Sequence, residues 1–206
     1  AKSGDVISYD LNDKKLKTVS AELLLTLKQK PGVILAVTNG LIRVEIKSED
    51  VTTLPLESIF DFDYSTKSFY SEKYKTDTKA AHEVIGFKTR KSLFGYEKFT
   101  VFTAFSGKVN VYSYDDEAKK YYRLAENAEI RNGAVSFYNN ALSDVIITKA
   151  TIAGAEPISF VPPKEKGAVD PFWIYVIIGG AAVLIVVPLV VWQVVGRPIG
   201  NKRKKL

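Results

Sequence analysis

The chain has 206 residues and a formal net charge of +6, and 46% of its residues are hydrophobic. This length suits one domain with an apolar core plus a short appendage, and it excludes two domains of ordinary size. The absence of cysteine excludes a disulfide framework, a thiolate metal site and a cysteine nucleophile.

The first predicted element is a helix over residues 20–29. Ser20 is a favoured N-cap residue, and Pro31-Gly32 would end the helix. Three leucines have the spacing that places them on one side of it: Leu23, Leu24 and Leu27. We therefore expect one short helix with an apolar face before the strands begin.

A first β-hairpin is predicted over residues 33–46. Asn39-Gly40 in its centre is the dipeptide typical of a type I′ turn. It separates an apolar run, 33–38, from a second run, 41–46. The second run alternates, which places its apolar side chains on one face and its charged side chains on the other. The apolar set is Ile42, Val44 and Ile46, and the charged set is Arg43 and Glu45.

Residues 64–90 form the least regular stretch of the chain, in which aromatic residues are interleaved with lysines, serines and threonines. One interpretation is a long solvated loop. The other is an interaction loop, because exposed aromatic residues among lysines are typical of protein interfaces. On this second interpretation the candidate partner contacts are Phe69, Tyr70 and Tyr74.

Two further hairpins and one strand are predicted downstream. The hairpins turn at Ser106-Gly107, between 99–105 and 108–114, and at Asn132-Gly133, between 129–131 and 134–138. The additional strand covers 144–152. We therefore predict a mainly β domain over residues 1–160, rich in β-hairpins, with an α+β fold as the alternative.

One short pattern occurs twice. Ser8-Tyr9-Asp10 is followed by Lys14-Lys15, and Ser113-Tyr114-Asp115 is followed at the same spacing by Lys119-Lys120. Each copy has the composition of a strand that ends in an aspartate able to bond to the backbone of the following turn. A duplication would explain the pattern, but we favour two independent uses of one kind of turn.

No sequence motif indicates an enzyme. The one histidine, His82, lacks the second histidine of an H-E-x-x-H zinc site, because position 86 is Gly86, and no nucleophile elbow is present. Two carboxylate pairs could in principle bind calcium or act as acid and base, but exposed polar positions explain them more simply: Asp61 with Asp63, and Asp115 with Asp116. We predict no catalytic, cofactor or metal site.

Residues 161–171 form a Pro-rich, polar linker, and residues 172–195 carry no charge. At about 1.5 Å per residue these 24 residues extend over about 36 Å, enough to cross a membrane. We predict one transmembrane helix. Its membrane-interface residues are Trp173, Tyr175 and Trp192, and its candidate packing positions against a partner helix are Gly179, Gly180, Ala181, Ala182 and Pro188.

The tail, 196–206, has five basic residues and no acidic one, so it carries +5 of the net charge of +6. The positive-inside rule places the tail on the cytoplasmic or stromal side and the β domain on the extracytoplasmic or lumenal side. The basic residues also favour contact with membrane lipid, while nucleic-acid binding is not expected because interleaved aromatic residues are missing. They are Arg197, Lys202, Arg203, Lys204 and Lys205. The last five residues also match a K-x-K-x-x retrieval signal of the endoplasmic reticulum.

An exported domain ahead of a C-terminal anchor normally requires an N-terminal export signal, and the absence of methionine suits a mature chain that has lost it. The absence of cysteine and of Asn-x-Ser/Thr sequons favours a thylakoid or a prokaryotic envelope over the endoplasmic reticulum. We therefore expect a non-enzymatic, membrane-anchored accessory, assembly or scaffold subunit that contacts other membrane-protein subunits. The alternative is a membrane-tethered module that binds an extracytoplasmic small molecule or glycan.

Overall fold

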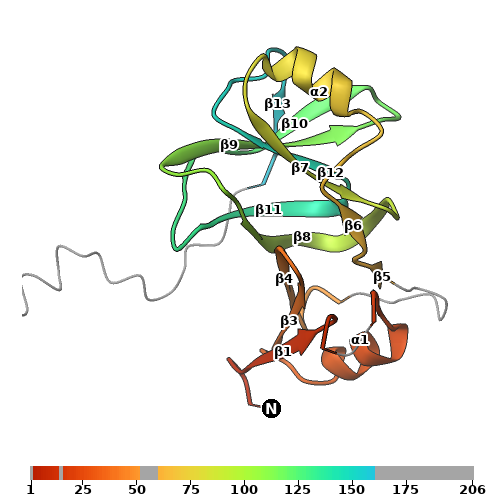
Figure 1. Cartoon of the computed structure of the whole chain (residues 1–206). Coiled ribbons are helices and arrows are strands. Elements are labelled where there is room, and N and C mark those ends of the chain that lie inside the picture. The colour runs from red at the N-terminus through yellow and green to blue at the C-terminus, as the bar shows by residue number, and fades with distance from the viewer. Residues whose placement is uncertain (1, 14–15, 52–59, 161–206) are drawn as a thin grey trace, which may run out of the picture. The chain divides into compact units, whose positions relative to one another are not determined.

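The computed structural model describes residues 2–13, 16–51 and 60–160. Within these residues the chain forms thirteen strands and two short helices (Figure 1). The prediction of a mainly β domain is confirmed. Most of the strands belong to two sheets, which pack face to face.

The first sheet has five strands in the order β1-β3-β4-β8-β11. β1 pairs with β3 in parallel, and the other neighbours are antiparallel. The strands are β1 (Val6–Asp10), β3 (Ile34–Asn39), β4 (Ile42–Lys47), β8 (Lys91–Phe102) and β11 (Ala134–Leu142).

The second sheet has six strands in the order β13-β10-β9-β12-β7-β6. They are β6 (Tyr64–Ser65), β7 (His82–Phe87), β9 (Lys108–Asp115), β10 (Lys120–Glu129), β12 (Asp144–Thr148) and β13 (Glu156–Pro157). A separate pair joins β2 (Thr18–Val19) to β5 (Phe60–Asp61). Helix α2 (Ser71–Thr78) covers the face of the second sheet that is turned away from β8 and β11 (Figure 1).

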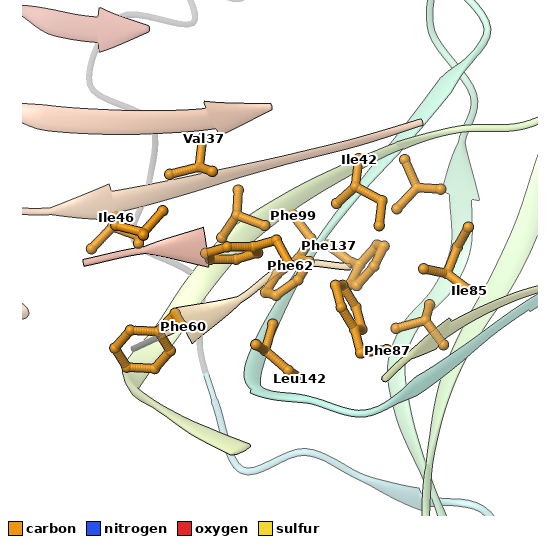
Figure 2. Packing of buried hydrophobic residues seen from close by; sticks show 14 of the residues in the cluster. Val37, Ile42, Ile46, Phe60, Phe62, Ile85, Phe87, Phe99, Phe137 and Leu142 are labelled. Atoms are coloured by element: carbon orange, nitrogen blue, oxygen red, sulfur yellow. The ribbon is translucent and has the colours of Figure 1, made fainter. Parts of the chain in front are cut away.

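The main hydrophobic core fills the space between the two sheets. Phe99 and Phe137 of the first sheet stack at 5.6 Å between ring centroids, and Phe87 of the second sheet meets Phe99 edge-on at 6.2 Å. Figure 2 shows Ile85 and Phe87 facing this aromatic pair. Because burying one large apolar side chain contributes about 1.5–3 kcal/mol, this cluster is the principal source of the stability of the fold.

A second buried cluster lies on the other face of the six-stranded sheet, under α2. It differs from the main core because four of its seven buried members are tyrosines. Its residues are Tyr74, Val84, Tyr112, Tyr114, Tyr121, Ile146 and Ile152. The six-stranded sheet is thus covered on both faces, which explains the nearly continuous burial of β9 and β12.

The predicted helix is confirmed as α1 (Ala21–Lys28). Ser20 is its N-cap, and the amide of Leu23 donates a 3.3 Å hydrogen bond to the Ser20 hydroxyl oxygen. Leu24 and Leu27 are buried, and Leu23 packs against the same core.

The first predicted hairpin is confirmed, with one difference at its turn. β3 and β4 pair so that Asn39 lies opposite Ile42, which leaves Gly40 and Leu41 as the two loop residues. Only Gly40 has a positive φ, +55°. Glycine at the first loop position is the pattern of a type II′ turn rather than of the expected type I′ turn.

The other two predicted hairpins are wrong. Strands β8 and β9 form near the predicted positions, but they belong to different sheets, and β9 pairs with β10 and β12 instead. At the third site Asn132 and Gly133 have φ values of +53° and +74°, as a type I′ turn requires, and Arg131 bridges to Ala134. The chain on either side then diverges into β10 and β11, which are strands of different sheets.

The interpretation of residues 64–90 as a long solvated loop is also wrong, because this stretch contains β6, α2 and β7. Helix α2 lacks an apolar stripe, since its buried residues are Tyr74 and Thr78. The predicted strand 144–152 is present in part, as β12.

The two copies of the repeated pattern share a turn but not a sheet environment. Oδ1 of Asp10 accepts hydrogen bonds from the amides of Asn12 and Asp13, and Oδ1 of Asp115 accepts from those of Glu117 and Ala118. After Asp115 the chain returns as the antiparallel strand β10, whereas β1 has a parallel neighbour. This difference supports two uses of one aspartate-capped turn.

The predicted linker (161–171), transmembrane helix (172–195) and basic tail (196–206), with their interface and helix-packing residues, lie outside the described residues. Neither helix of the described residues has the length and hydropathy that a membrane crossing requires.

Candidate functional site

The three aromatic residues predicted as partner contacts lie in three different environments. Phe69 precedes α2 and its side chain is 94% exposed. Tyr70 is half-buried, with its ring 5.2 Å from that of Phe69 and 5.1 Å from that of Tyr114. Tyr74 is fully buried, so its side chain is not available at the surface. Of the three, only Phe69 presents most of its side chain to solvent.

Tyr74 is buried because its hydroxyl has a partner inside the domain. The hydroxyl donates a 2.6 Å hydrogen bond to Oδ2 of Asp144, which is itself only 2% exposed. The hydroxyl of Ser68 donates to the same oxygen, and the guanidinium of Arg90 lies 3.4 Å from it. Burial, with the adjacent carboxylate, raises the pKa of Tyr74 well above its usual value, so the hydroxyl stays protonated as a donor. These contacts fix α2 on the sheet.

Arg90 joins this buried group to the surface. Its guanidinium forms an ion pair with Asp116 and lies 5.5 Å from the ring centroid of Tyr70. Partial burial disfavours the charge on Arg90, but Asp144 and Asp116 outweigh that effect and raise the pKa of the guanidinium. The sequence indicated that Asp116 is a simple exposed carboxylate. In the structure it is instead a partner in an ion-pair network.

The other predicted carboxylate pair also has a structural role. Asp63 lies 2.8 Å from the ammonium of Lys17 and 2.6 Å from that of Lys88, and its amide donates to Asp61. Although partial burial acts in the opposite direction, the hydrogen bonds from Lys17 and Lys88 lower the pKa of Asp63. Within 2–13, 16–51 and 60–160, no three histidine, aspartate or glutamate side chains are grouped as a metal site requires.

A surface hollow of about 560 Å³ lies beside β7 at one end of the two sheets. Leu41 of the β3–β4 turn and Phe102 at the end of β8 line it, and they are 40% and 47% exposed. Thr66 and Ser71 also line it, so the loop that carries Phe69 forms part of its wall. The hollow thus brings two exposed large apolar residues together with the segment that bears the most exposed aromatic side chain.

Polar groups of β7 complete the wall of this hollow. His82 and Glu83 both line it, and a carboxylate oxygen of Glu83 accepts a 2.9 Å hydrogen bond from the amide of Ala104. Nδ1 of His82 lies 3.3 Å from the hydroxyl of Thr78 and 3.2 Å from the carbonyl oxygen of Ala80. The hollow therefore has an apolar floor with a small number of polar groups, the usual composition of a binding site.

The sequence-based predictions missed Leu41 and Phe102. Both belong to runs that were assigned to strands, and a strand residue is expected to be buried on one face. A positional signal was available for Leu41, which directly follows the turn glycine, Gly40, whereas Phe102 lies in the middle of its predicted run, 99–105, where no such signal marks it.

Glu97 of β8 is another buried residue that the sequence did not single out. It is 1% exposed, and neither of its carboxylate oxygens has a hydrogen-bond partner. Burial, together with the negative charge of Asp50, raises the pKa of Glu97 to about 8, while Lys47 acts in the opposite direction. Phe99 follows Glu97 by two positions on β8, so the two side chains lie on the same face of the strand. Phe99 and its partner on β4, Val44, both belong to the core, and Glu97 therefore faces the core as well.

Comparisons with models of known protein families, with curated proteins and with solved structures find no match for this chain.

Proposed function

We propose that the chain is a non-enzymatic, membrane-anchored binding subunit, whose β domain docks on a partner protein through the hollow lined by Leu41 and Phe102. The predicted helix over residues 172–195 holds the domain at the membrane and packs against another helix of the same complex. The accessory or scaffold role, the extracytoplasmic or lumenal location, and the thylakoid or prokaryotic-envelope compartment are parts of this proposal.

The observation that carries the proposal is the exposure of Leu41 and Phe102 in one hollow. Single exposed apolar residues are common on protein surfaces, but apolar residues gathered in a concave site are typical of interfaces. Phe69, on the loop that forms part of the wall, adds a large aromatic side chain of the kind enriched in such interfaces. A partner side chain that filled the hollow would remove Leu41 and Phe102 from water.

Co-purification of the full-length chain tests this proposal. Membranes are extracted with a mild detergent, and the chain and its partners are identified by native electrophoresis and mass spectrometry. We expect a complex larger than a monomer, which Leu41→Ser combined with Phe102→Ser reduces at least about tenfold, since each buried apolar side chain contributes about 1.5–3 kcal/mol.

Leu16→Ser is the matched control, because Leu16 is 45% exposed but does not line the hollow. It should leave the complex intact. A chain that migrates only as a monomer, or a complex that Leu16→Ser and the double variant weaken equally, would contradict the proposal.

The alternative function is binding of an extracytoplasmic small molecule or glycan in the same hollow. Its volume of about 560 Å³ lies within the range of ligand pockets, about 300–1,000 Å³. Thermal shifts of the full-length chain with a panel of sugars and apolar metabolites separate the two functions. A shift that Phe102→Ser abolishes, without any co-purifying protein, would favour the small ligand.

A further inference from the structure

A second hollow, of about 470 Å³, lies between the C-terminal half of α2, the β9–β10 turn and the loop at 152–154. No residue lines both this hollow and the apolar one. Its lining is strongly basic, with four lysines and a single carboxylate, that of Asp77. The residues are Lys73, Thr76, Asp77, Lys79, Lys119, Lys120, Tyr121, Ile152, Ala153 and Gly154.

Two of the four lysines are neutralised by neighbours. Lys73 lies 2.7 Å from Asp77, and Lys120 lies 2.7 Å from Glu156. Lys79 and Lys119 form no ion pair with any carboxylate in the part of the chain that the structure describes. The ammonium of Lys119 lies 5.7 Å from the ring centroid of Tyr70 and also interacts with the charge of Asp116, a carboxylate that Arg90 already pairs. The hollow therefore has an excess of positive charge, which Lys79 and Lys119 provide.

The backbone at these two lysines is unusual. Lys79 and Lys119 have φ values of +50° and +55°, in the left-handed region that disfavours most side chains. The other non-glycine residues with positive φ among the described residues are Asn127 and Asn132, and asparagine tolerates this region well. Glycine or asparagine would fit positions 79 and 119 with less strain. Both strained lysines line the same hollow, and backbone strain of this kind clusters at functional sites.

The chemistry of the hollow favours an anion with two negative charges. A phosphate monoester carries about −1.5 to −2 at neutral pH, which matches the ammonium groups of Lys79 and Lys119, and its oxygens accept the hydrogen bonds that ammonium groups donate. Tyr121 is only 8% exposed, and the ammonium of Lys73 lies 5.2 Å from its ring centroid, so it lines the hollow without offering a free aromatic face. The hydroxyl of Tyr121 is already bonded to Asp77 at 2.6 Å.

We propose that Lys79 and Lys119 form a binding site for the phosphate group of a small molecule, in the hollow between α2 and the β9–β10 turn. The phosphate contacts the two ammonium groups, and the rest of the molecule extends from the hollow toward solvent. This chemistry is shared by soluble phosphate esters and by the headgroup of an anionic phospholipid, and the test distinguishes these two sources.

The test is calorimetric titration of the full-length chain, held in micelles of a neutral detergent, with three probes. They are inorganic phosphate, glycerol 3-phosphate and a short-chain phosphatidic acid used below its micellar concentration. Wild type should bind glycerol 3-phosphate with a Kd in the millimolar range or below. Lys79→Asn combined with Lys119→Asn should weaken binding at least about tenfold, because both charge-assisted contacts are lost.

The variants are chosen so that loss of the fold cannot account for loss of binding. Asparagine accepts a positive φ more readily than lysine, so the melting temperature of the double variant should equal or exceed that of wild type. Lys75→Gln is the matched control: Lys75 is an exposed lysine of α2 that does not line the hollow. It should bind all three probes as wild type does.

Tighter binding of phosphatidic acid than of glycerol 3-phosphate, lost in the double variant, identifies a lipid headgroup as the source. Equal affinity for the two identifies a soluble phosphate ester. Absence of binding to wild type at about 10 mM of every probe overturns the proposal. So does equal binding by wild type and a folded double variant, or equal weakening by Lys75→Gln, since either indicates only unspecific attraction to surface charge.

Discussion

The hydroxyl of Tyr74 donates to the carboxylate of Asp144, and this 2.6 Å hydrogen bond joins α2 to the first residue of β12 across 70 positions of sequence. Both groups are buried. Because α2 contributes few apolar side chains to the domain, this polar contact and the tyrosines around it attach the helix to the sheet. Attachment of α2 also positions two lysines of the basic hollow. Lys73 lines this hollow, and Lys79 is one of the two lysines proposed to bind a phosphate group.

Tyr74→Phe should therefore destabilise the domain by about 1.5–3 kcal/mol, since it removes a donor from a buried charged acceptor. Urea unfolding of the full-length chain, followed by tyrosine fluorescence, measures the change. Tyr70→Phe is the control, because the Tyr70 hydroxyl lies 3.5 Å from Asp116, at the limit of a hydrogen bond, and its loss should be small. Equal effects of the two substitutions would contradict the assigned role of Asp144.

Glu97 should make stability depend on pH. Its pKa is about 8 in the folded domain and 4.5 in an unfolded chain, so the folded state binds the proton more strongly. The resulting contribution to stability is complete below about pH 4.5 and is lost as the pH rises through about 8. At about 1.4 kcal/mol per pKa unit, the loss is of the order of several kcal/mol.

Unfolding free energies measured from pH 4 to pH 9 test this prediction with wild type and Glu97→Gln. The wild-type curve should fall across this range, and the glutamine variant, which cannot ionise, should have a much flatter one. Parallel curves for the two proteins would show that Glu97 does not titrate in this window.

Gly40 should be intolerant of a side chain for two reasons that can be separated. Its φ is +55°, and a Cβ at this position would lie 2.6 Å from the hydroxyl oxygen of Tyr64, which accepts a hydrogen bond from the amide of Leu41. Gly107 has a φ of +79° but no atom within 4 Å of the corresponding Cβ. Gly107→Ala should therefore cost about 1 kcal/mol, the backbone effect alone, and Gly40→Ala more than this. Thermal unfolding of the two variants measures the difference.

Phe160 should stabilise the C-terminal end of the described domain. Its ring stacks on Tyr96 at 4.4 Å and lies 5.1 Å from the ring of Tyr138, so it contacts both β8 and β11. Phe160→Ala should cost about 1–3 kcal/mol, at about 0.5–1.5 kcal/mol for each aromatic pair. Phe69→Ala, at the 94% exposed position, should change stability by less than about 0.5 kcal/mol in the same urea unfolding experiment.

The elements that could be predicted from the sequence are those whose determinants lie within a few residues. Ser20 caps α1 through the amide three positions later, and the alternation of β4 follows from its own residues. Helix α2 could not be predicted in this way, because its buried tyrosine depends on a carboxylate 70 residues away. Because this partner is so distant in the sequence, Tyr74 was expected at the surface.

Strand pairing failed for a related physical reason. A dipeptide such as Ser106-Gly107 favours a local change of chain direction, but the partner of each flanking strand depends on which apolar face it must bury. Residues 103–107 carry the chain from β8 of one sheet to β9 of the other, and this separation allows Phe99 and Val111 to face a common core from opposite sides. For the candidate site, the exposure of Phe69 could be predicted from the sequence, whereas the hollow lined by Leu41 and Phe102 depends on this crossing between sheets.

The way the chain leaves the domain has a mechanical consequence. The last strand, β13, pairs with β10 over only two residues, Glu156 and Pro157, and the ring of Phe160 follows directly. A pulling force applied at residue 160 therefore reaches the stacked rings and this short parallel pair first, and it loads them one contact at a time. These few contacts would therefore separate before the two large sheets do.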